Sequence, residues 1–573
     1  MSIQSVPIES MLVQDFIKTK IYSVLRRSLE GLELDEQTIN AELDKLKIEA
    51  AKSVEYGDYS TTAPLVFNKL LKKPPVQLAE QIKAAIENDL AEICSVEILP
   101  PGFINFRLTE KAHQINVKHL LNGELVSKKQ RSGKLMIEYV SANPTGDLHL
   151  GHGRGAVVGS ALAEIIRATG REVLTEFYIN DAGEQIQKLG KSAWNIYKNQ
   201  PSEPGDYPPE LLKDYVIDIA EGLNLEQLTE EVKNRILNKQ KFVLERINVK
   251  FDKWTSEKED LHQKGALEQA IQKLKNLNLT YEKEGALWLK SSELGDERDR
   301  VLIKSENKKP TYLAGDIAYH LDKFERADEL LDIFGADHQG QEISLKVALK
   351  AFDKDSDKFH ILFIQFVSLQ ENGEEVKMSK RNGSVITVEE VVEKTGADAF
   401  RFTLLVSHIN NRMVFDVDLA TKADDQNPVF YVQYAHARAC SIIRNALQPH
   451  AETKETICTS EELEKAIQEG NILLALEKNE LEDKEILATK ELIKKLSFFS
   501  NEVHRSAESM NPSSIAYYLM DLATLFHSFY SHCRAINYSK KGLSMARLLI
   551  IKAFQRVLQR GLSLLLVSAP ERM

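Results

Sequence analysis

The chain has 573 residues, of which 43% are hydrophobic and 28% charged, and its formal net charge is −11. This length exceeds what a single hydrophobic core can hold, so several domains are expected, and the proportions are those of a folded soluble protein. No apolar run reaches bilayer length, no signal peptide is recognisable, and the four cysteines lie far apart without a CxxC pair. These features argue against a membrane protein, a disulfide framework and a cysteine-rich zinc site, and they favour the cytoplasm.

The N-terminal residues 1–112 are expected to form a small α+β domain. Helical periodicity predicts helices over residues 11–25 and 39–51. Residues 96–108 are expected to form strands around Pro100-Pro101-Gly102.

An α/β domain is expected over residues 113–424, because apolar strands alternate with helices from Lys134 onward. A charged, mostly helical stretch over about 190–300 reads as an insertion into this domain, with strands near its end at 286–289 and 300–303. The clearest strands of the domain itself are 135–140, 173–179, 330–334 and 361–369.

Residues 425–573 are predicted to form an α-helical bundle, since helical periodicity dominates and glycines are few. Within it, residues 531–570 contain no Asp or Glu. This stretch is either a solvated helix face or a surface for a polyanion. Its positive charges are Arg534, Lys540, Lys541, Arg547, Lys552, Arg556 and Arg560.

Candidate chemistry is concentrated after the first α/β strand, where residues 137–153 run from a strand through a polar loop into a helix. His149 and His152 stand three residues apart at the predicted helix N-terminus, so both imidazoles can point the same way. Free N–H groups and the helix dipole favour a phosphate there, and the imidazoles add donors for oxygens that gain charge at an attacked α-phosphate. Gly151 leaves room for a planar ring to approach the backbone.

Other interpretations of this segment stay open on the residues alone. The histidines could be packed core residues, a helix cap or a metal pair, although no third ligand is evident. Residues 151–156 fit the dinucleotide pattern GxGxxA with Glu172 downstream, but ten residues separate Val140 from Gly151, whereas that fingerprint turns directly out of its strand. Gly190-Lys191-Ser192 resembles the end of a phosphate-binding loop, but Gln185 occupies the position of its first glycine.

A second polar segment follows the strand that ends near Leu369. It contains Lys377-Met378-Ser379-Lys380-Arg381, whose lysines can neutralise a leaving pyrophosphate. A solvated charge run is the alternative interpretation. Thr387 and Glu390 have the spacing of a capping box that starts the next helix.

His149-Leu150-Gly151-His152 and residues 377–381 together resemble the HIGH and KMSKS signature motifs of class I aminoacyl-tRNA synthetases. Leu150 replaces isoleucine and Arg381 replaces the last serine, and neither change removes a group that the chemistry needs. Over nearly the whole chain the sequence is similar to arginyl-tRNA synthetases of bacterial type. The segments that carry this resemblance are 141–152, 177–183, 315–320, 335–338, 431–438 and 569–573, together with 57–60 and 101–108 in the N-terminal domain.

The resemblance implies roles for individual residues. His149, Gly151 and His152 would bind ATP and stabilise the pentacoordinate α-phosphate. Lys380, assisted by Lys377, would grip the β- and γ-phosphates. Met378 and Ser379 complete that part of the ATP site. The HIGH-type region as a whole comprises Ala142, Asn143, Pro144, Thr145, Gly146, Asp147, Leu148, His149, Leu150, Gly151 and His152.

The resemblance also implies an arginine site. Ser141 and Asn143 would lie around the substrate backbone. A guanidinium is a planar cation with five donors, which carboxylates and an aromatic face recognise well. On sequence alone Glu138 could be a surface acid at a strand end and Asp316 a helix cap. The guanidinium pocket implied by the family comprises Glu138, Tyr312 and Asp316, with Asp337 and His338 nearby.

The implied fold is a Rossmann-like class I catalytic domain with an insertion, an N-terminal tRNA-binding domain and a C-terminal anticodon-binding bundle. The implied reaction converts L-arginine and ATP into arginyl-adenylate and then esterifies arginine to the 3′-terminal adenosine of tRNA(Arg). Mg²⁺ would accompany ATP, no metal would be held by protein ligands, and a monomer is expected. Two other hypotheses remain: a dinucleotide-dependent oxidoreductase, which residues 377–381 do not support, and a catalytically idle tRNA-binding relative, which would be expected to lose His149, His152 or Lys380.

Overall fold

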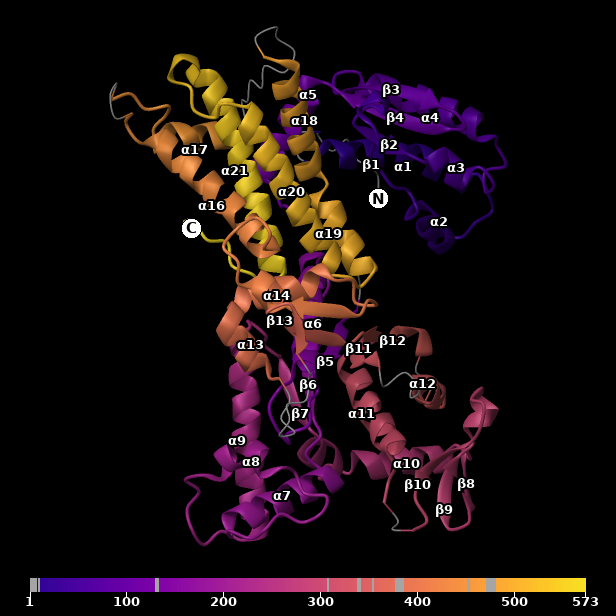
Figure 1. Ribbon diagram of the computed structural model, residues 1–573. Coiled ribbons are helices and arrows are strands. Elements are labelled where there is room, and N and C mark those ends of the chain that lie inside the picture. Colours follow the sequence, from indigo (N-terminus) through magenta and orange to yellow (C-terminus); the bar gives the residue numbers. More distant parts are fainter. Residues whose placement is uncertain are drawn as a thin grey trace.

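The computed structural model describes residue 8 and residues 11–128, 133–306, 309–336, 342–352, 355–376, 386–450, 454–469 and 481–573. Figure 1 shows an elongated arrangement, with the N-terminal domain beside a long helical bundle and the parallel sheet in the middle. Two further groups of elements lie apart from each other at the lower end. None of the described helices is long and apolar enough to cross a membrane.

The N-terminal domain is built on an antiparallel sheet of order β1-β2-β4-β3. The predicted strand pair is confirmed as β3 (Cys94–Leu99) and β4 (Phe103–Leu108). The expected helix over 39–51 is wrong in its second half, because the chain there alternates buried Leu46 and Ile48 with exposed lysines, a strand-like period of two. The other elements are α1 (Val13–Glu30), α2 (Glu36–Leu43), β1 (Glu49–Ala50), β2 (Tyr59–Thr61), α3 (Ala63–Phe67) and α4 (Pro75–Leu90).

The central sheet has five parallel strands in the order β12-β11-β5-β6-β7. Three predicted strands are confirmed as β5 (Leu135–Tyr139), β6 (Val173–Ile179) and β11 (Glu329–Gly335). The predicted strand over 361–369 is two strands, β12 (Phe359–Ile364) and β13 (Val367–Glu371), and the second joins another sheet. That sheet also contains β14 (Glu374–Val376) and β15 (Met413–Asp416).

Helices cover both faces of the parallel sheet, as strands buried on both sides require. Along β5, Ile137 packs into a core with α6 (Leu150–Ala168), while Met136 packs into a separate core with α11 (Tyr312–Arg326) and α12 (Glu342–Lys350). Gly159 allows α6 to approach the sheet closely, because a Cβ there would lie 2.3 Å from Tyr139 Cγ. The start of α6 is thereby fixed over the carboxyl end of β5.

The stretch expected as one insertion contains a strand of the central sheet. β7 (Lys253–Ser256) pairs with β6, so the chain leaves the sheet twice, once before β7 and once after it. β7 contains only one strongly apolar residue, Trp254, so no apolar run marks it, whereas the strands predicted at 286–289 and 300–303 are apolar runs and are confirmed. The first excursion carries α7 (Glu184–Tyr197), α8 (Pro209–Val216) and α9 (Leu225–Arg246). The second carries a π-helical turn (Glu257–His262), α10 (Ala266–Asn276), β8 (Thr280–Lys283), β9 (Ala286–Leu289) and β10 (Arg300–Ile303).

The C-terminal part is helical, as predicted. α5 (Glu110–Asn122) leads out of the N-terminal domain and packs against this bundle, so residue 112 falls inside a helix that both parts share. The fully buried Arg401 ties the bundle to the catalytic domain by donating to Leu565 O, Ile247 O and Ser160 Oγ. Three helices precede residue 425: α13 (Val388–Thr395), α14 (Ala397–Val406) and α15 (Val417–Ala420). The helices of the bundle are α16 (Pro428–Leu447), α17 (Ser460–Glu469), α18 (Asp483–Ser497), α19 (Phe499–Glu508), α20 (Ser513–His532) and α21 (Lys541–Leu564).

Candidate active site

A cavity of about 640 Å³ opens at the carboxyl ends of the parallel strands, beside the start of α6. Ligands of parallel α/β sheets are commonly bound at this edge. The structure brings together there a large part of the sequence-predicted site: Glu138, Ser141, Ala142, Asn143, His149, Gly151, His152, Tyr312 and Asp316. Pro144, Thr145, Gly146, Asp147, Leu148 and Leu150 belong to the same loop and helix start but do not line the cavity. Asp337, His338, Lys377, Met378, Ser379 and Lys380 lie outside the described residues.

The backbone is strained where β5 enters this cavity. Val140 has φ +71° and the next residue, Ser141, has φ +42°, a left-handed conformation that is unfavourable for a β-branched side chain. Each such residue costs about 1–3 kcal/mol and persists only where its surroundings enforce it. Here the turn directs Ser141 Oγ to donate to Glu138 Oε1 at 2.7 Å and to accept from Tyr178 N at 3.1 Å. The hydrogen bonds of Ser141 in this strained turn therefore fix Glu138 and the backbone at the pocket wall.

The two histidines begin α6 and cap it reciprocally. His149 Nδ1 accepts from the His152 main-chain N–H, and His152 Nδ1 accepts from the His149 main-chain N–H, both at 3.3 Å. Their rings stack with centroids 3.6 Å apart. The helix-cap interpretation is thus correct, and it has a chemical consequence. An Nδ1 that accepts a hydrogen bond carries no proton, so each neutral imidazole carries its proton on Nε2.

Gly151 serves this histidine pair. A Cβ at Gly151 would lie 3.0 Å from His149 Cε1, so the space that its missing side chain leaves is taken up by the His149 ring. Burial, and then the neighbouring His149, lowers the pKa of His152 to about 3. Above that pH His152 is neutral, so it acts as a hydrogen-bond donor and not as a cation.

The opposite wall of the cavity carries the carboxylates. Glu138 is 4% exposed, so it is not a surface acid at a strand end. Thr311 caps α11, so Asp316 is not the helix cap that the sequence left possible. Burial, together with Glu138 and Asp332, raises the pKa of Asp316 to about 6. Tyr312 stands at the rim with 75% of its surface exposed.

Sequence reasoning missed a polar layer beneath these carboxylates. The buried Lys323 and His320 lie under Glu138 and Asp316, next to Asp332 of β11. The signal was present in the sequence, since Asp316, His320 and Lys323 follow the i, i+4, i+7 spacing of one helix face.

An aromatic wall of the cavity was also missed. Tyr178 of β6 packs on Tyr319 of α11 with ring centroids 4.4 Å apart. Tyr319 Oη donates to Glu176 Oε1 at 2.9 Å, and Arg326 also donates to Glu176. These contacts fix α11 against β6.

The dinucleotide and phosphate-loop interpretations do not fit the structure. Glu172 is an exposed residue that pairs with Lys134 at 2.8 Å, and it precedes β6, whereas the cavity lies at the strand's other end. Gly190-Lys191-Ser192 lies inside α7 and forms no loop. No group of His, Cys, Asp and Glu in the described part of the chain is arranged to hold a metal ion.

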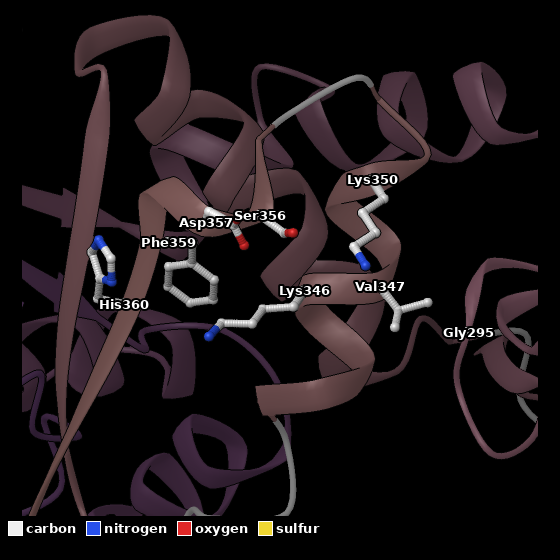
Figure 2. A pocket seen from close by; sticks show the side chains of 8 residues that line it. All are labelled: Gly295, Lys346, Val347, Lys350, Ser356, Asp357, Phe359 and His360. Atoms are coloured by element: carbon white, nitrogen blue, oxygen red, sulfur yellow. The ribbon is translucent and has the colours of Figure 1, made fainter. Parts of the chain in front are cut away.

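A second hollow lies at the amino end of β12, away from the histidines. It is lined by residues of α12 and of the segment that enters β12, and Figure 2 shows Lys346 reaching from α12 toward Phe359 and His360. His360 Nε2 lies 3.0 Å from Glu329 Oε1, so this ring nitrogen already has a hydrogen-bond partner within the fold. This hollow is separate from the site built by Glu138, His149 and Asp316.

The acid-free stretch of the bundle is only partly a surface feature. Arg547 is buried, bonding Glu485 at 2.6 Å and Arg534 O at 2.8 Å. Arg556 donates to Leu120 O and so joins the bundle to α5. The expectation of a basic surface is therefore wrong for these two arginines and fits the exposed Arg534, Lys540, Lys541 and Arg560.

Comparison with known proteins identifies the family. Family models match the chain as "Arginyl tRNA synthetase N terminal domain" over residues 15–108, "tRNA synthetases class I (R), catalytic domain" over 116–203, "tRNA synthetases class I (I, L, M and V)" over 335–416 and "DALR anticodon binding domain" over 432–573.

Relatives match over nearly the full length. The arginine–tRNA ligase of Shouchella clausii is 38% identical, with 97% of this chain and 99% of the relative covered. That of Syntrophotalea carbinolica is 37% identical, with 97% and 100% covered. The fold matches Thermus thermophilus arginyl-tRNA synthetase with a TM-score of 0.73 at 23% identity, covering 98% of this chain and all of that one. The Plasmodium falciparum arginyl-tRNA synthetase gives 0.68 at 17% identity with the same coverage. The chain belongs to the arginyl-tRNA synthetases, class I ligases that join arginine to tRNA.

Proposed function

We propose that the cavity between α6 and α11 is where this arginine–tRNA ligase activates L-arginine with ATP and transfers it to the 3′-terminal adenosine of tRNA(Arg). The observation that carries this assignment is the pairing of His149 and His152 with Glu138 and Asp316 around one cavity. One wall offers neutral donors for a phosphate, and the other offers acceptors for a guanidinium. An enzyme that joins arginine to the α-phosphate of ATP needs both kinds of wall close together.

The histidines support the chemistry at the α-phosphate. As the arginine carboxylate attacks, negative charge grows on the non-bridging oxygens while pyrophosphate departs. Nε2–H donors that are already oriented stabilise this charge without reorganisation. The free N–H groups of the first turn of α6 add to them. Lys377 and Lys380, with Met378 and Ser379, are proposed to hold the β- and γ-phosphates, and Mg²⁺ is proposed to accompany ATP.

The carboxylates support recognition of the amino acid. Glu138 and Asp316 accept from the guanidinium, and Tyr312 at the rim offers an aromatic face. Ser141 and Asn143 line the same cavity, and they are proposed to contact the substrate backbone. Asp337 and His338 stay proposals from family resemblance.

The three parts of the chain are proposed to share the tRNA. Residues 1–112 would contact its outer corner, residues 113–424 its acceptor end, and residues 425–573 its anticodon stem and loop. On the bundle the exposed Tyr434 lies near His527, and such rings stack on unpaired bases. We propose that the protein works as a monomer in the cytoplasm.

The raised pKa of Asp316 predicts how arginine use depends on pH. The carboxylate accepts from a guanidinium only when ionised, and with a pKa of about 6 it becomes protonated as the pH falls through that value. We expect kcat/KM for arginine to fall about tenfold per pH unit below that value, because one proton is taken up. Neutral His152 adds no inflection there. Steady-state charging assays between pH 5 and 9 would measure this, and a flat profile down to pH 5 would contradict the role of Asp316.

The family resemblance further predicts that arginine activation needs tRNA. Binding energy from remote contacts can be used to order the catalytic site. We expect arginine-dependent ATP–pyrophosphate exchange to stay near background in nuclease-treated enzyme and to appear when tRNA(Arg) is added. Omission of arginine from the same mixture gives the baseline. Strong exchange without tRNA would refute the requirement, and no exchange under either condition would refute the proposed reaction.

A further inference from the structure

A buried cation lies beneath the proposed arginine pocket and is not used by the role given to that pocket above. Lys323 of α11 is 0% exposed, and its Nζ donates to Glu138 Oε2 and, at 2.7 Å, to Asp332 Oδ1. The ammonium also lies 4.4 Å from the centroid of the Tyr319 ring. A charge in a dry interior is tolerated only when it is paired. Lys323, Glu138 and Asp332 therefore form one unit.

A buried histidine completes this unit. His320 Nδ1 lies 2.7 Å from the Asp316 main-chain O, and its Nε2 lies 2.7 Å from Asp332 Oδ2. Burial favours the protonated form of Asp332, but Lys323 and His320 outweigh it and hold the pKa of Asp332 below its usual range. Each ring nitrogen of His320 therefore lies against an oxygen of this unit.

Lys323 opposes the effect of burial on Glu138. Burial raises the pKa of the Glu138 carboxyl, Lys323 lowers it by its charge and its hydrogen bond, and Asp332 raises it. Glu176 of β6, which faces Lys323 from the next strand, is compensated by Arg326. A carboxylate kept ionised at this wall of the pocket can accept from a guanidinium, which carries one positive charge.

We propose that Lys323 is a positioning residue for the selection of arginine, holding Glu138 as a fixed carboxylate at the base of the pocket; this inference rests on the proposed function of the cavity. Both carboxylates bond the same nitrogen, so without Lys323 they would face each other with one cation fewer. Two carboxylates that lie so close together share a proton. Glu138 would then be turned toward Asp332 and would no longer accept fully from the substrate.

The test is Lys323→Met, which keeps an unbranched side chain and removes the charge. In charging assays at pH 7 we expect the KM for arginine to rise by roughly 10- to 100-fold, since a carboxylate acceptor for a charged group is lost. The KM values for ATP and tRNA should stay within about threefold, because Lys323 touches neither proposed site. The arginine defect should shrink toward pH 9 as the shared proton leaves, a response that a purely structural role would not give.

A double variant and a comparison variant sharpen the test. Lys323→Met with Asp332→Asn removes one charge of each sign and with it the repulsion between the two carboxylates, so the KM for arginine should move back toward that of the parent. This double variant leaves no surplus buried charge, so it also decides the matter if Lys323→Met alone does not fold. Arg326→Met removes a cation from the same helix that does not touch Glu138, and it should lower the unfolding temperature without a selective arginine defect.

The outcomes separate this inference from the pocket assignment. A selective arginine defect in Lys323→Met that the double variant relieves supports the inference. An unchanged KM for arginine, an equal loss for all substrates, or a double variant no better than the single one overturns it. Asp316→Asn is measured in parallel. If Asp316→Asn impairs arginine use and Lys323→Met does not, only the role of Lys323 fails; if neither does, the pocket itself is misassigned.

Discussion

Replacing His149 or His152 with alanine is expected to lower kcat by roughly a hundredfold or more, because oriented donors at a developing oxyanion typically contribute that much. The reciprocal cap shows why either change should suffice, since each imidazole is held by the main-chain N–H of the other residue. The measurement is single-turnover formation of arginyl-adenylate with tRNA present. Unchanged turnover in both variants would contradict the placement of the α-phosphate at this helix.

The loss of the cap must be distinguished from the loss of chemistry. An alanine at an N-cap position costs about 0.5–2 kcal/mol of stability. His149→Asn is a matched control, because asparagine can cap the helix but cannot place an Nε2–H donor in the cavity. We expect His149→Asn to unfold near the parent temperature and to be nearly as inactive as His149→Ala. Recovery of activity with the cap would mean that the histidines have only a structural role.

Asp316→Asn is expected to weaken arginine use strongly while ATP use changes little. The change keeps the shape of the side chain and removes the charge that balances the guanidinium. Truncating one partner of a desolvated charge pair costs on the order of 2–5 kcal/mol, which is roughly 30-fold to several thousandfold in kcat/KM for arginine. The fall in activity below pH 6 should also disappear, because the titrating carboxyl has been removed.

Asp322→Asn is the matched control for this variant. Asp322 lies on the same helix, is 39% exposed and pairs with Arg326 at 2.7 Å. The same chemical change there should leave the KM for arginine within about threefold, since an exposed ion pair contributes little. If Asp316→Asn and Asp322→Asn had the same KM for arginine, the guanidinium would have to bind elsewhere.

The backbone of the site could be predicted because its signals are local. The strand over β5, the loop and the cap at His149 follow from apolar runs, turn residues and the free N–H groups of a helix start. The capping box at Thr387 and Glu390 is likewise confirmed by mutual hydrogen bonds of 3.0 and 3.1 Å. The stacking of His149 on His152 follows from their spacing once the helix begins there.

What the sequence could not supply depends on contacts between distant segments. Lys323 meets Glu138 across 185 residues, and although its spacing places it on one helix face with Asp316 and His320, nothing local indicates that this face is buried. Arg547 looks like part of a basic surface until Glu485, from another helix, is found beside it. β1 and β7 were missed for a different reason: they are brief and lack an apolar run, and only pairing with a neighbouring strand defines them.

The most direct test of the whole account is aminoacylation of an unfractionated tRNA pool by the purified protein, with ATP and each of the twenty amino acids in turn. The account predicts that arginine alone becomes attached to tRNA, and that attachment needs ATP and stops in Asp316→Asn. Charging with a different amino acid, or no charging with arginine when tRNA(Arg) is present, would contradict it.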